Sequence, residues 1–271
     1  MERALIFLGD IHLEYSTKKL IHAIKIRGIE NSDIVQVGDF GLGYQSIEKD
    51  RLMLAELNIF LKKKNCTVSA IRGNHDDPKI FNGKSLGFSN ITLVSDNSIL
   101  ELCGKKILMI GGAVSVDRYR LTEGKSYWKD EVFVFDKEAL DKLDLSEVDI
   151  VCTHSSPNFA QPIAFNTFVY DCADKDPGLL RDLEIERNLI TEFYEYVKPK
   201  MPKLTHYFYG HFHQKVGESI GGVYFRLLGE DEYYDYCRSL LYLKIRSSRN
   251  FFTIHDNNWR FLNTSLSVTW D

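Results

Sequence analysis

The sequence predicts an α/β protein built on a parallel sheet that helices cover. Short strand-like apolar runs alternate with helix-like stretches at the start of the chain, which is typical of such a sheet. Most of these runs end at a glycine, a histidine or both. The composition agrees, because 271 residues of which 44% are hydrophobic and 27% charged can bury a sizeable core. We expect one domain over residues 1–271.

Strands are expected wherever a short apolar run is bounded by turn residues, at residues 4–8, 33–37, 67–71, 91–94, 106–110, 149–152 and 207–209. Two helices fall between the first three runs. One follows Ser16, and the other starts at Ser46 and repeats apolar residues at spacings of three and four. A third helix is predicted over about residues 179–197, because Pro199 and Pro202 follow directly.

The C-terminal part of the chain predicts a second sheet. Apolar runs at residues 223–228, 240–245 and 251–254 indicate more strands, in the manner of an antiparallel edge or a separate sheet. We expect the motif-bearing core to cover about residues 1–228. Strands in residues 229–271 would then complete or extend the second sheet.

Charge and cysteine usage limit the partners and the compartment. The 34 Lys and Arg residues against 38 Asp and Glu give a net charge of -4, and the charges are mixed along the chain, so no basic surface for nucleic acid or an anionic membrane is expected. The early apolar run is far too short for a membrane span or a signal-peptide core. Five cysteines without a Cys-x-x-Cys pair fit neither a disulfide framework nor a thiolate zinc site. We therefore expect a cytoplasmic protein with no membrane partner.

Metal-capable side chains follow five of the expected strands. They lie in the motifs Gly9-Asp10-Ile11-His12, Gly38-Asp39, Gly73-Asn74-His75-Asp76, His154 and Gly210-His211-Phe212-His213. The carboxyl ends of strands in an open α/β sheet meet at the edge where ligands bind. Five of the eight histidines fall in these motifs, and unrelated turns have no reason to repeat ligand types after each strand. The pattern therefore predicts a site where several ligands converge on a pair of metals.

In type and order, these motifs resemble the signature of the calcineurin-like metallophosphoesterase superfamily: Asp-x-His, Gly-Asp, Gly-Asn-His-Asp/Glu, His and Gly-His-x-His. The resemblance spans residues 9–213, about three-quarters of the chain. It implies a four-layer α/β/β/α sandwich, with two mixed sheets flanked by helices. It also implies a metal-dependent phosphoric ester hydrolase.

The resemblance also implies a set of metal ligands. Carried over position by position, one metal would be held by Asp10, His12, Asp39 and His213, and the other by Asp39, Asn74, His154 and His211. Asp39 would bridge the two cations and offset their repulsion. Carboxylate, amide and imidazole donors suit two divalent ions, with manganese as the first choice and iron, zinc, cobalt or nickel as alternatives.

Two further residues receive catalytic roles from the same comparison. In the family scheme a hydroxide activated by the metals attacks phosphorus, and His75 assists the leaving group. Asp76 is the candidate to orient the His75 ring, and the alternative is a turn cap ahead of Pro78.

The second motif departs from that of the Ser/Thr protein phosphatases, which read Gly-Asp-x-Val-Asp-Arg-Gly and grip the substrate phosphate with the arginine. Residues 38–43 lack that arginine here. Arg118 and Arg120, in a loop after the strand at 106–110, are the candidates to bind phosphate in its place, and a solvated structural role is the alternative. The segment around them resembles small bacterial and phage metallophosphoesterases.

The expected substrate is a phosphorylated small molecule or a nucleotide-type compound, as either a monoester or a diester. A nuclease or a cyclic-nucleotide phosphodiesterase is an alternative within the fold, although the lack of a basic stripe does not favour a long nucleic acid. A non-catalytic metal-binding scaffold is an alternative of another class. The full ligand set and the adjacent His75 and Asp76 argue against it.

Overall fold

The computed structural model describes residues 3–12, 17–44, 46–82 and 86–239. The chain divides into two units, Met1–Cys237 and Arg238–Asp271, and every element described below belongs to the first. The strands predicted at residues 240–245 and 251–254 lie outside the described residues.

The first sheet has five strands in the order β11-β1-β2-β3-β4. Its strands are β1 (Ala4–Leu8), β2 (Ser32–Gln36), β3 (Thr67–Ala70), β4 (Ile91–Leu93) and β11 (Tyr233–Asp235). The first four run parallel, and β11 pairs antiparallel with β1. The predicted parallel sheet at the start of the chain is therefore confirmed.

The second sheet has six strands in the order β5-β6-β7-β8-β10-β9. Its strands are β5 (Ser98–Leu102), β6 (Lys105–Ile110), β7 (Ile150–Thr153), β8 (His206–Tyr209), β9 (Val216–Ile220) and β10 (Val223–Leu227). Its central strands are parallel, whereas β5 and β9 close the two edges in antiparallel fashion. Both sheets are thus mixed.

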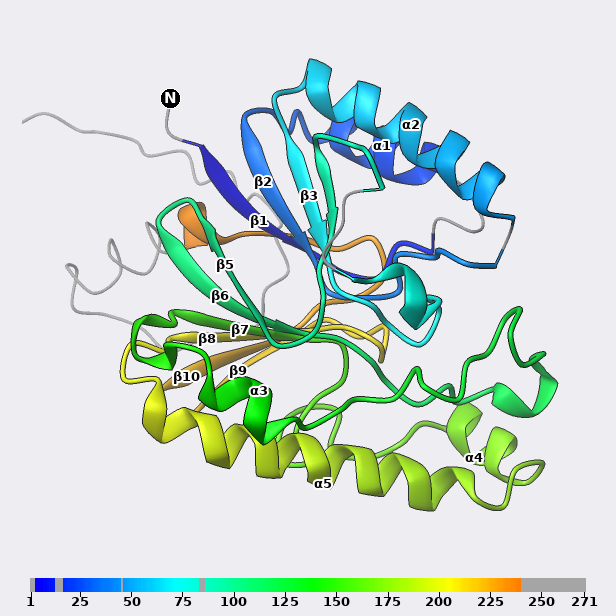
Figure 1. Ribbon diagram of the computed structural model, residues 1–271. Coiled ribbons are helices and arrows are strands. Elements are labelled where there is room, and N and C mark those ends of the chain that lie inside the picture. The colour runs from blue at the N-terminus through cyan, green and yellow to red at the C-terminus, as the bar shows by residue number, and fades with distance from the viewer. Residues whose placement is uncertain (1–2, 13–16, 45, 83–85, 240–271) are drawn as a thin grey trace, which may run out of the picture. The chain divides into compact units, whose positions relative to one another are not determined.

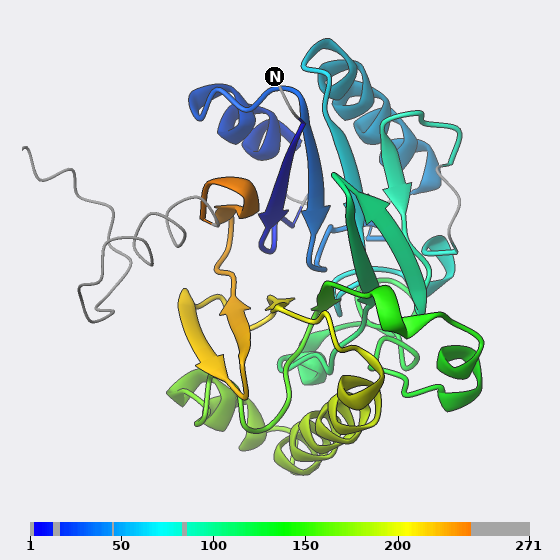
Figure 2. The same ribbon diagram turned by 90° about the vertical axis from the view of Figure 1, so that its left-hand side faces the viewer.

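Helices cover the outer face of each sheet (Figures 1 and 2). Helices α1 (Thr17–Ile26) and α2 (Ile47–Lys63) lie on the first sheet, and α3 (Lys137–Asp141) and α5 (Leu179–Val197) lie on the second. A further short helix, α4 (Thr167–Ala173), precedes α5. The layers follow the order helix, sheet, sheet, helix, which confirms the predicted fold class.

Apolar packing fixes the four layers. Helix α2 begins at Ser46, whose hydroxyl accepts a hydrogen bond from the Lys49 amide, and it buries Leu54, Leu57 and Leu61 against the first sheet. Between the sheets, the rings of Phe7 on β1 and Phe208 on β8 stack with centroids 3.7 Å apart and an interplanar angle of 7°. This contact joins two strands that each lead into a predicted ligand motif.

Strand β11 corrects one expectation. Strands in residues 229–271 were expected to complete or extend the second sheet, but β11, which lies in the described part of that range, pairs with β1 at the edge of the first sheet. The amide of Asp231 donates to the Asp10 carbonyl and the amide of Gly9 donates to the Glu232 carbonyl, so the chain leaving β10 crosses between the sheets here. The edge of β1 would otherwise present unpaired backbone groups, and β11 satisfies them.

Among the helices that the structure describes, none combines the length and the apolar character needed to cross a bilayer. Helix α5, the longest of them, has 19 residues and carries charged side chains along its outer face.

We predict that His206 makes the fold sensitive to acid. Its side chain lies among the rings of Phe208 and Tyr236, its Nε2 has no hydrogen-bond partner among the described residues, and burial lowers its pKa to about 4. Below about pH 6.5 the unfolded chain takes up a proton on His206, whereas the buried ring in the folded protein stays neutral until about pH 4. The free energy of unfolding therefore has its full value above about pH 6.5 and decreases as the pH falls toward about 4. The loss should reach about 3 kcal/mol.

Urea unfolding at several pH values tests this prediction. Wild type should lose more stability than His206→Leu over that range, whereas replacing the exposed His22 with leucine should leave the pH dependence as in wild type. Equal acid sensitivity of wild type and His206→Leu would contradict it.

Candidate metal centre

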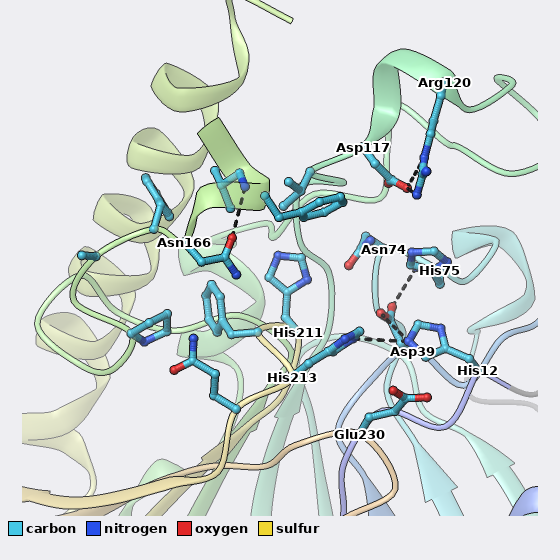
Figure 3. Close-up of a pocket in the computed structure, with 18 residues that line it drawn as sticks. His12, Asp39, Asn74, His75, Asp117, Arg120, Asn166, His211, His213 and Glu230 are labelled. Atoms are coloured by element: carbon cyan, nitrogen blue, oxygen red, sulfur yellow. Dashed lines mark hydrogen bonds and ion pairs between the residues drawn. The ribbon is translucent and has the colours of Figure 1, made fainter. Parts of the chain in front are cut away.

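The predicted ligands all follow the carboxyl ends of strands, and the structure brings them to one place. They come from the first sheet after β1, β2 and β3, and from the second sheet after β7 and β8. Figure 3 shows His12, Asp39, Asn74, His211 and His213 facing the same cavity. The adjacent edges of two sheets therefore build one site.

Four side chains form the first group of donors: Asp10, His12, Asp39 and His213. Their donor atoms lie within 4.8 Å of one another. The Nε2 atoms of His12 and His213 are 3.4 Å apart, and His213 Nε2 is 3.2 Å from Asp10 Oδ2. Ligands about 2.1 Å from a single ion are separated by roughly 3.0–3.5 Å, so this spacing fits one bound cation.

The second group contains Asp39, His154 and His211. Nε2 of His154 lies 3.2 Å from Asp39 Oδ1 and 3.2 Å from the Asn74 side-chain oxygen. The Asn74 amide is oriented by its NH₂ group, which donates to the Ser115 hydroxyl. Asp39 thus belongs to both groups, which is the position that the sequence predicted for a bridging carboxylate.

Hydrogen bonds around these groups leave nitrogen lone pairs suited to a cation. His154 Nδ1 lies 2.8 Å from the Val37 carbonyl and must donate to it. Nε2 therefore faces the side-chain oxygens of Asp39 and Asn74, where a cation can take the place of a proton. His211 Nε2 is buried and has no hydrogen-bond partner among the described residues. Such buried atoms cost free energy unless something binds them. The residues present therefore fit a pair of divalent cations.

Electrostatics support the same conclusion. Burial opposes ionisation of Asp39, but His154 and His75 hold the pKa of its carboxyl well below the ordinary value. Burial likewise opposes protonation of His154, yet Asp39 raises the pKa of the ring to about 9. The ionised Asp39 carboxylate thus places negative charge where the ligand atoms converge, and that charge favours a bound cation.

Four of the ligand residues adopt a left-handed backbone: His12, Asp39, His211 and His213, with φ between 48° and 69°. This conformation is uncommon outside glycine and tends to occur at functional sites. The glycines that precede the ligands serve mainly close packing. A Cβ at Gly73 would lie 2.0 Å from Asp39 Oδ1, and one at Gly210 would lie 2.2 Å from Asp10 Oδ1.

His75 lies on the wall of the cavity beside the ligands. Its backbone amide donates to Asp39 Oδ1 over 2.8 Å, and its Nδ1 lies 2.6 Å from the Tyr44 hydroxyl. Tyr44 was not selected from the sequence, since its position five residues after Asp39 carries no motif.

Asp76 is placed differently from the expectation. Its buried carboxylate accepts hydrogen bonds from four backbone amides, those of Phe40, Gly41, Leu42 and Gly73. These bonds tie the turn that carries Asp39 to the turn that carries Asn74. Both carboxylate oxygens are engaged in this way, so Asp76 holds the backbone of the site, a structural role close to the capping alternative.

The two predicted phosphate-binding arginines both pair with carboxylates. Arg118 contacts Asp176 and Asp182, each over 2.6 Å, and so links its loop to the start of α5. Arg120 pairs with Asp117 over 2.6 Å, and both residues lie on the cavity wall (Figure 3). Arg118 therefore has the structural role that was the alternative, while only Arg120 borders the cavity.

The cavity has a volume of about 430 Å³ and two kinds of wall. One wall is formed by the metal ligands and His75. The other is largely apolar and comes mostly from the segment before and within α4: Pro162, Ala164, Phe165, Phe168 and Val169. Asn166 and Glu230 also border it, and neither belongs to a motif that the sequence would have revealed.

Comparison with known proteins identifies the family. The model of the calcineurin-like phosphoesterases matches residues 4–215, and the chain belongs to that family. This membership and the donor groups support a metal-dependent hydrolase of phosphoesters. No curated protein matches the sequence.

Several solved structures resemble this chain at low sequence identity. One crystal structure is 15% identical with a TM-score of 0.51, over 88% of this chain and 96% of that chain. Phosphopantetheinyl hydrolase from Mycobacterium tuberculosis is 12% identical with a TM-score of 0.47, over 85% and 90%. Vps29 from Entamoeba histolytica, complexed with zinc, is 13% identical with a TM-score of 0.32, over 83% and 73%. At 15% identity the first match supports the fold alone.

We predict that Gly38→Ala weakens metal binding by about 10- to 100-fold, the usual cost of disturbing the support of a ligand. Gly38 has a φ of 104°, and a Cβ there would lie 2.2 Å from His154 Nδ1, so the ring would have to leave its bond to the Val37 carbonyl. Calorimetric titration with Mn²⁺ measures the effect.

Gly104→Ala is the matched control, because Gly104 also has a positive φ but has open space where a Cβ would stand. It should bind Mn²⁺ as wild type does. Equal binding by Gly38→Ala and Gly104→Ala would show that His154 does not ligate a metal.

Proposed function

We propose that the chain is a dinuclear metal-dependent phosphoesterase that hydrolyses a phosphomonoester or a phosphodiester. The observation that carries this proposal is the position of Asp39, whose two carboxylate oxygens each face a separate group of ligands. Membership in the calcineurin-like phosphoesterase family supports the same reaction class. Manganese is the metal we propose first, and iron, zinc, cobalt and nickel suit the same donors.

The proposed ligands would be Asp10, His12, Asp39 and His213 for one ion, and Asp39, Asn74, His154 and His211 for the other. When bound, the two cations would polarise the phosphoryl oxygens and lower the pKa of water in the site. The chain itself would hold the ester against the apolar wall of the cavity and present His75 to the leaving oxygen.

His75 would supply the proton that the leaving oxygen needs. Water oxygen forms the new P–O bond, the P–O bond to the leaving oxygen breaks, and that oxygen takes a proton from the His75 ring. The proton that the attacking water loses returns to the site or to solvent, so one water is consumed for each ester cleaved. The backbone bond from His75 to Asp39 keeps the imidazole next to the ligands while this happens.

The cavity favours a small organic phosphate as substrate. Its volume of about 430 Å³ lies in the range of small-ligand sites, and the apolar wall can cover the organic part of a phosphorylated small molecule or a nucleotide. Among the described residues that line the cavity, Arg120 is the only lysine or arginine, and its side chain is paired with Asp117. This wall offers no track of cations for a long nucleic acid, so a nuclease remains the weaker alternative.

We propose a reducing compartment such as the cytoplasm for this protein. All five cysteines lie among the described residues and none forms a disulfide, which supports that proposal.

The complete donor set beside His75 supports an enzyme over a metal-binding scaffold, since a scaffold has no need of a proton donor next to its metals.

We predict that Asp39→Asn lowers the turnover of p-nitrophenyl phosphate or bis-p-nitrophenyl phosphate by at least about 10³-fold, because both groups of ligands lose a charged donor. His75→Asn should lower the turnover of the corresponding phenyl ester by about 10²- to 10⁴-fold, the usual contribution of a positioned acid, and should slow the p-nitrophenyl esters less because their leaving group needs little proton donation. The assay compares the two p-nitrophenyl esters with Mn²⁺ present, and the preferred one separates a monoesterase from a diesterase.

Glu101→Gln, which changes an exposed carboxylate on β5, is the control and should retain wild-type turnover. A chelator should abolish the wild-type reaction and added Mn²⁺ should restore it. If the wild-type protein binds two ions yet cleaves neither these esters nor nucleotide phosphates, the result would contradict the proposed enzyme and favour a non-catalytic metal-binding scaffold.

A further inference from the structure

We propose that Tyr44 is the positioning residue for His75, a role that rests on the proposed phosphoesterase function. Its hydroxyl oxygen lies 2.6 Å from His75 Nδ1, and the two rings are nearly parallel, with an interplanar angle of 4°. Neither the family match nor the sequence motifs assign Tyr44 a role.

A second contact of the same hydroxyl fixes which partner donates. The Tyr44 hydroxyl also lies 3.1 Å from the Ser126 carbonyl, and a carbonyl can only accept a hydrogen bond. The hydroxyl carries one hydrogen, which it gives to Ser126. For both bonds to exist at once, His75 must donate from Nδ1 to the tyrosine oxygen.

This arrangement selects one tautomer of His75. With Nδ1 protonated and bound, the ring exchanges its catalytic proton through Nε2. Tyr44 thereby fixes the orientation of the imidazole and determines which ring nitrogen, Nε2, gives up the proton. Carboxylates commonly orient catalytic histidines, but here the neighbouring acid, Asp76, is engaged by four backbone amides.

Tyr44 is itself held by the segment that follows β6. Its ring packs edge-on against Trp128, with centroids 5.5 Å apart, and Trp128 is buried. Glu131 accepts hydrogen bonds from the amides of Trp128 and Ser115, and Ser115 in turn orients Asn74. The segment that follows β6 therefore supports, through its buried residues, both a proposed metal ligand and the partner of His75.

The first test is the state of the His75 ring, which does not depend on activity. In the metal-free protein with ¹⁵N-labelled histidine, NMR at a pH where the ring is neutral should show His75 protonated at Nδ1, with the signal assigned by its loss in His75→Asn. Tyr44→Phe keeps the aromatic ring but removes the hydroxyl. We expect it to move the His75 signals toward the Nε2-protonated form that neutral imidazoles commonly adopt.

The second test is the dependence of rate on the leaving group. Tyr44→Phe should leave kcat for a p-nitrophenyl ester within about threefold of wild type, because that leaving group departs with little proton donation. For the matched phenyl ester we expect kcat to fall by about 10- to 100-fold with KM unchanged. In a His75→Asn background, Tyr44→Phe should have no further effect.

Tyr196→Phe is the matched control, since Tyr196 on α5 also makes a 2.6 Å hydrogen bond, to Asp141, away from the cavity. It should change neither the NMR signals nor the rates. The Tyr44 proposal is overturned if the His75 tautomer is unaltered in Tyr44→Phe, or if both esters slow equally. An inactive wild type with the predicted tautomer change would instead contradict the proposed function and leave the Tyr44–His75 pairing standing.

Discussion

The carboxylate of Asp39 is the element on which the rest of the site depends. Two divalent cations about 4 Å apart repel by roughly 16 kcal/mol at an effective dielectric constant of 20, and a shared carboxylate offsets part of that cost while fixing the separation. Asp39 meets this need through both oxygens: Oδ1 lies 3.2 Å from His154 Nε2, and Oδ2 lies 3.8 Å from His12 Nε2. It also accepts the His75 amide, so one side chain connects the two donor groups with the proposed acid.

The two sheets must meet closely around this carboxylate, because both of them supply ligands to the site. The stacked rings of Phe7 and Phe208 join β1 to β8, and the strands on either side deliver their ends to one edge. Close approach is possible because glycines stand where a Cβ would collide with Asp10, Asp39 or His154. Asp76 then ties the turns of β2 and β3 together through four amides.

Much of this could be predicted from the sequence, because each ligand directly follows a short apolar strand and local pattern therefore locates it. The strands β1 to β4, β6 to β8 and β10 and the helices α1, α2 and α5 were all expected near their observed bounds. Apart from the convergence of the ligands at the sheet edge, contacts between distant segments were not predictable. The pairing of β11 with β1, the ion pairs of Arg118 and the contact of Tyr44 with His75 each depend on how the chain folds back on itself, and no local spacing records that.

The most direct test of the shared role of Asp39 is to measure how many metal ions bind and whether they are coupled. Electron paramagnetic resonance gives both quantities as Mn²⁺ is added to the full chain. If Asp39 joins two sites, saturation requires two ions per chain and the spectrum shows an exchange-coupled pair, whereas Asp39→Asn gives at most uncoupled single ions. Saturation of the wild-type protein by one ion, or two ions whose signals remain those of isolated Mn²⁺, would contradict the shared carboxylate.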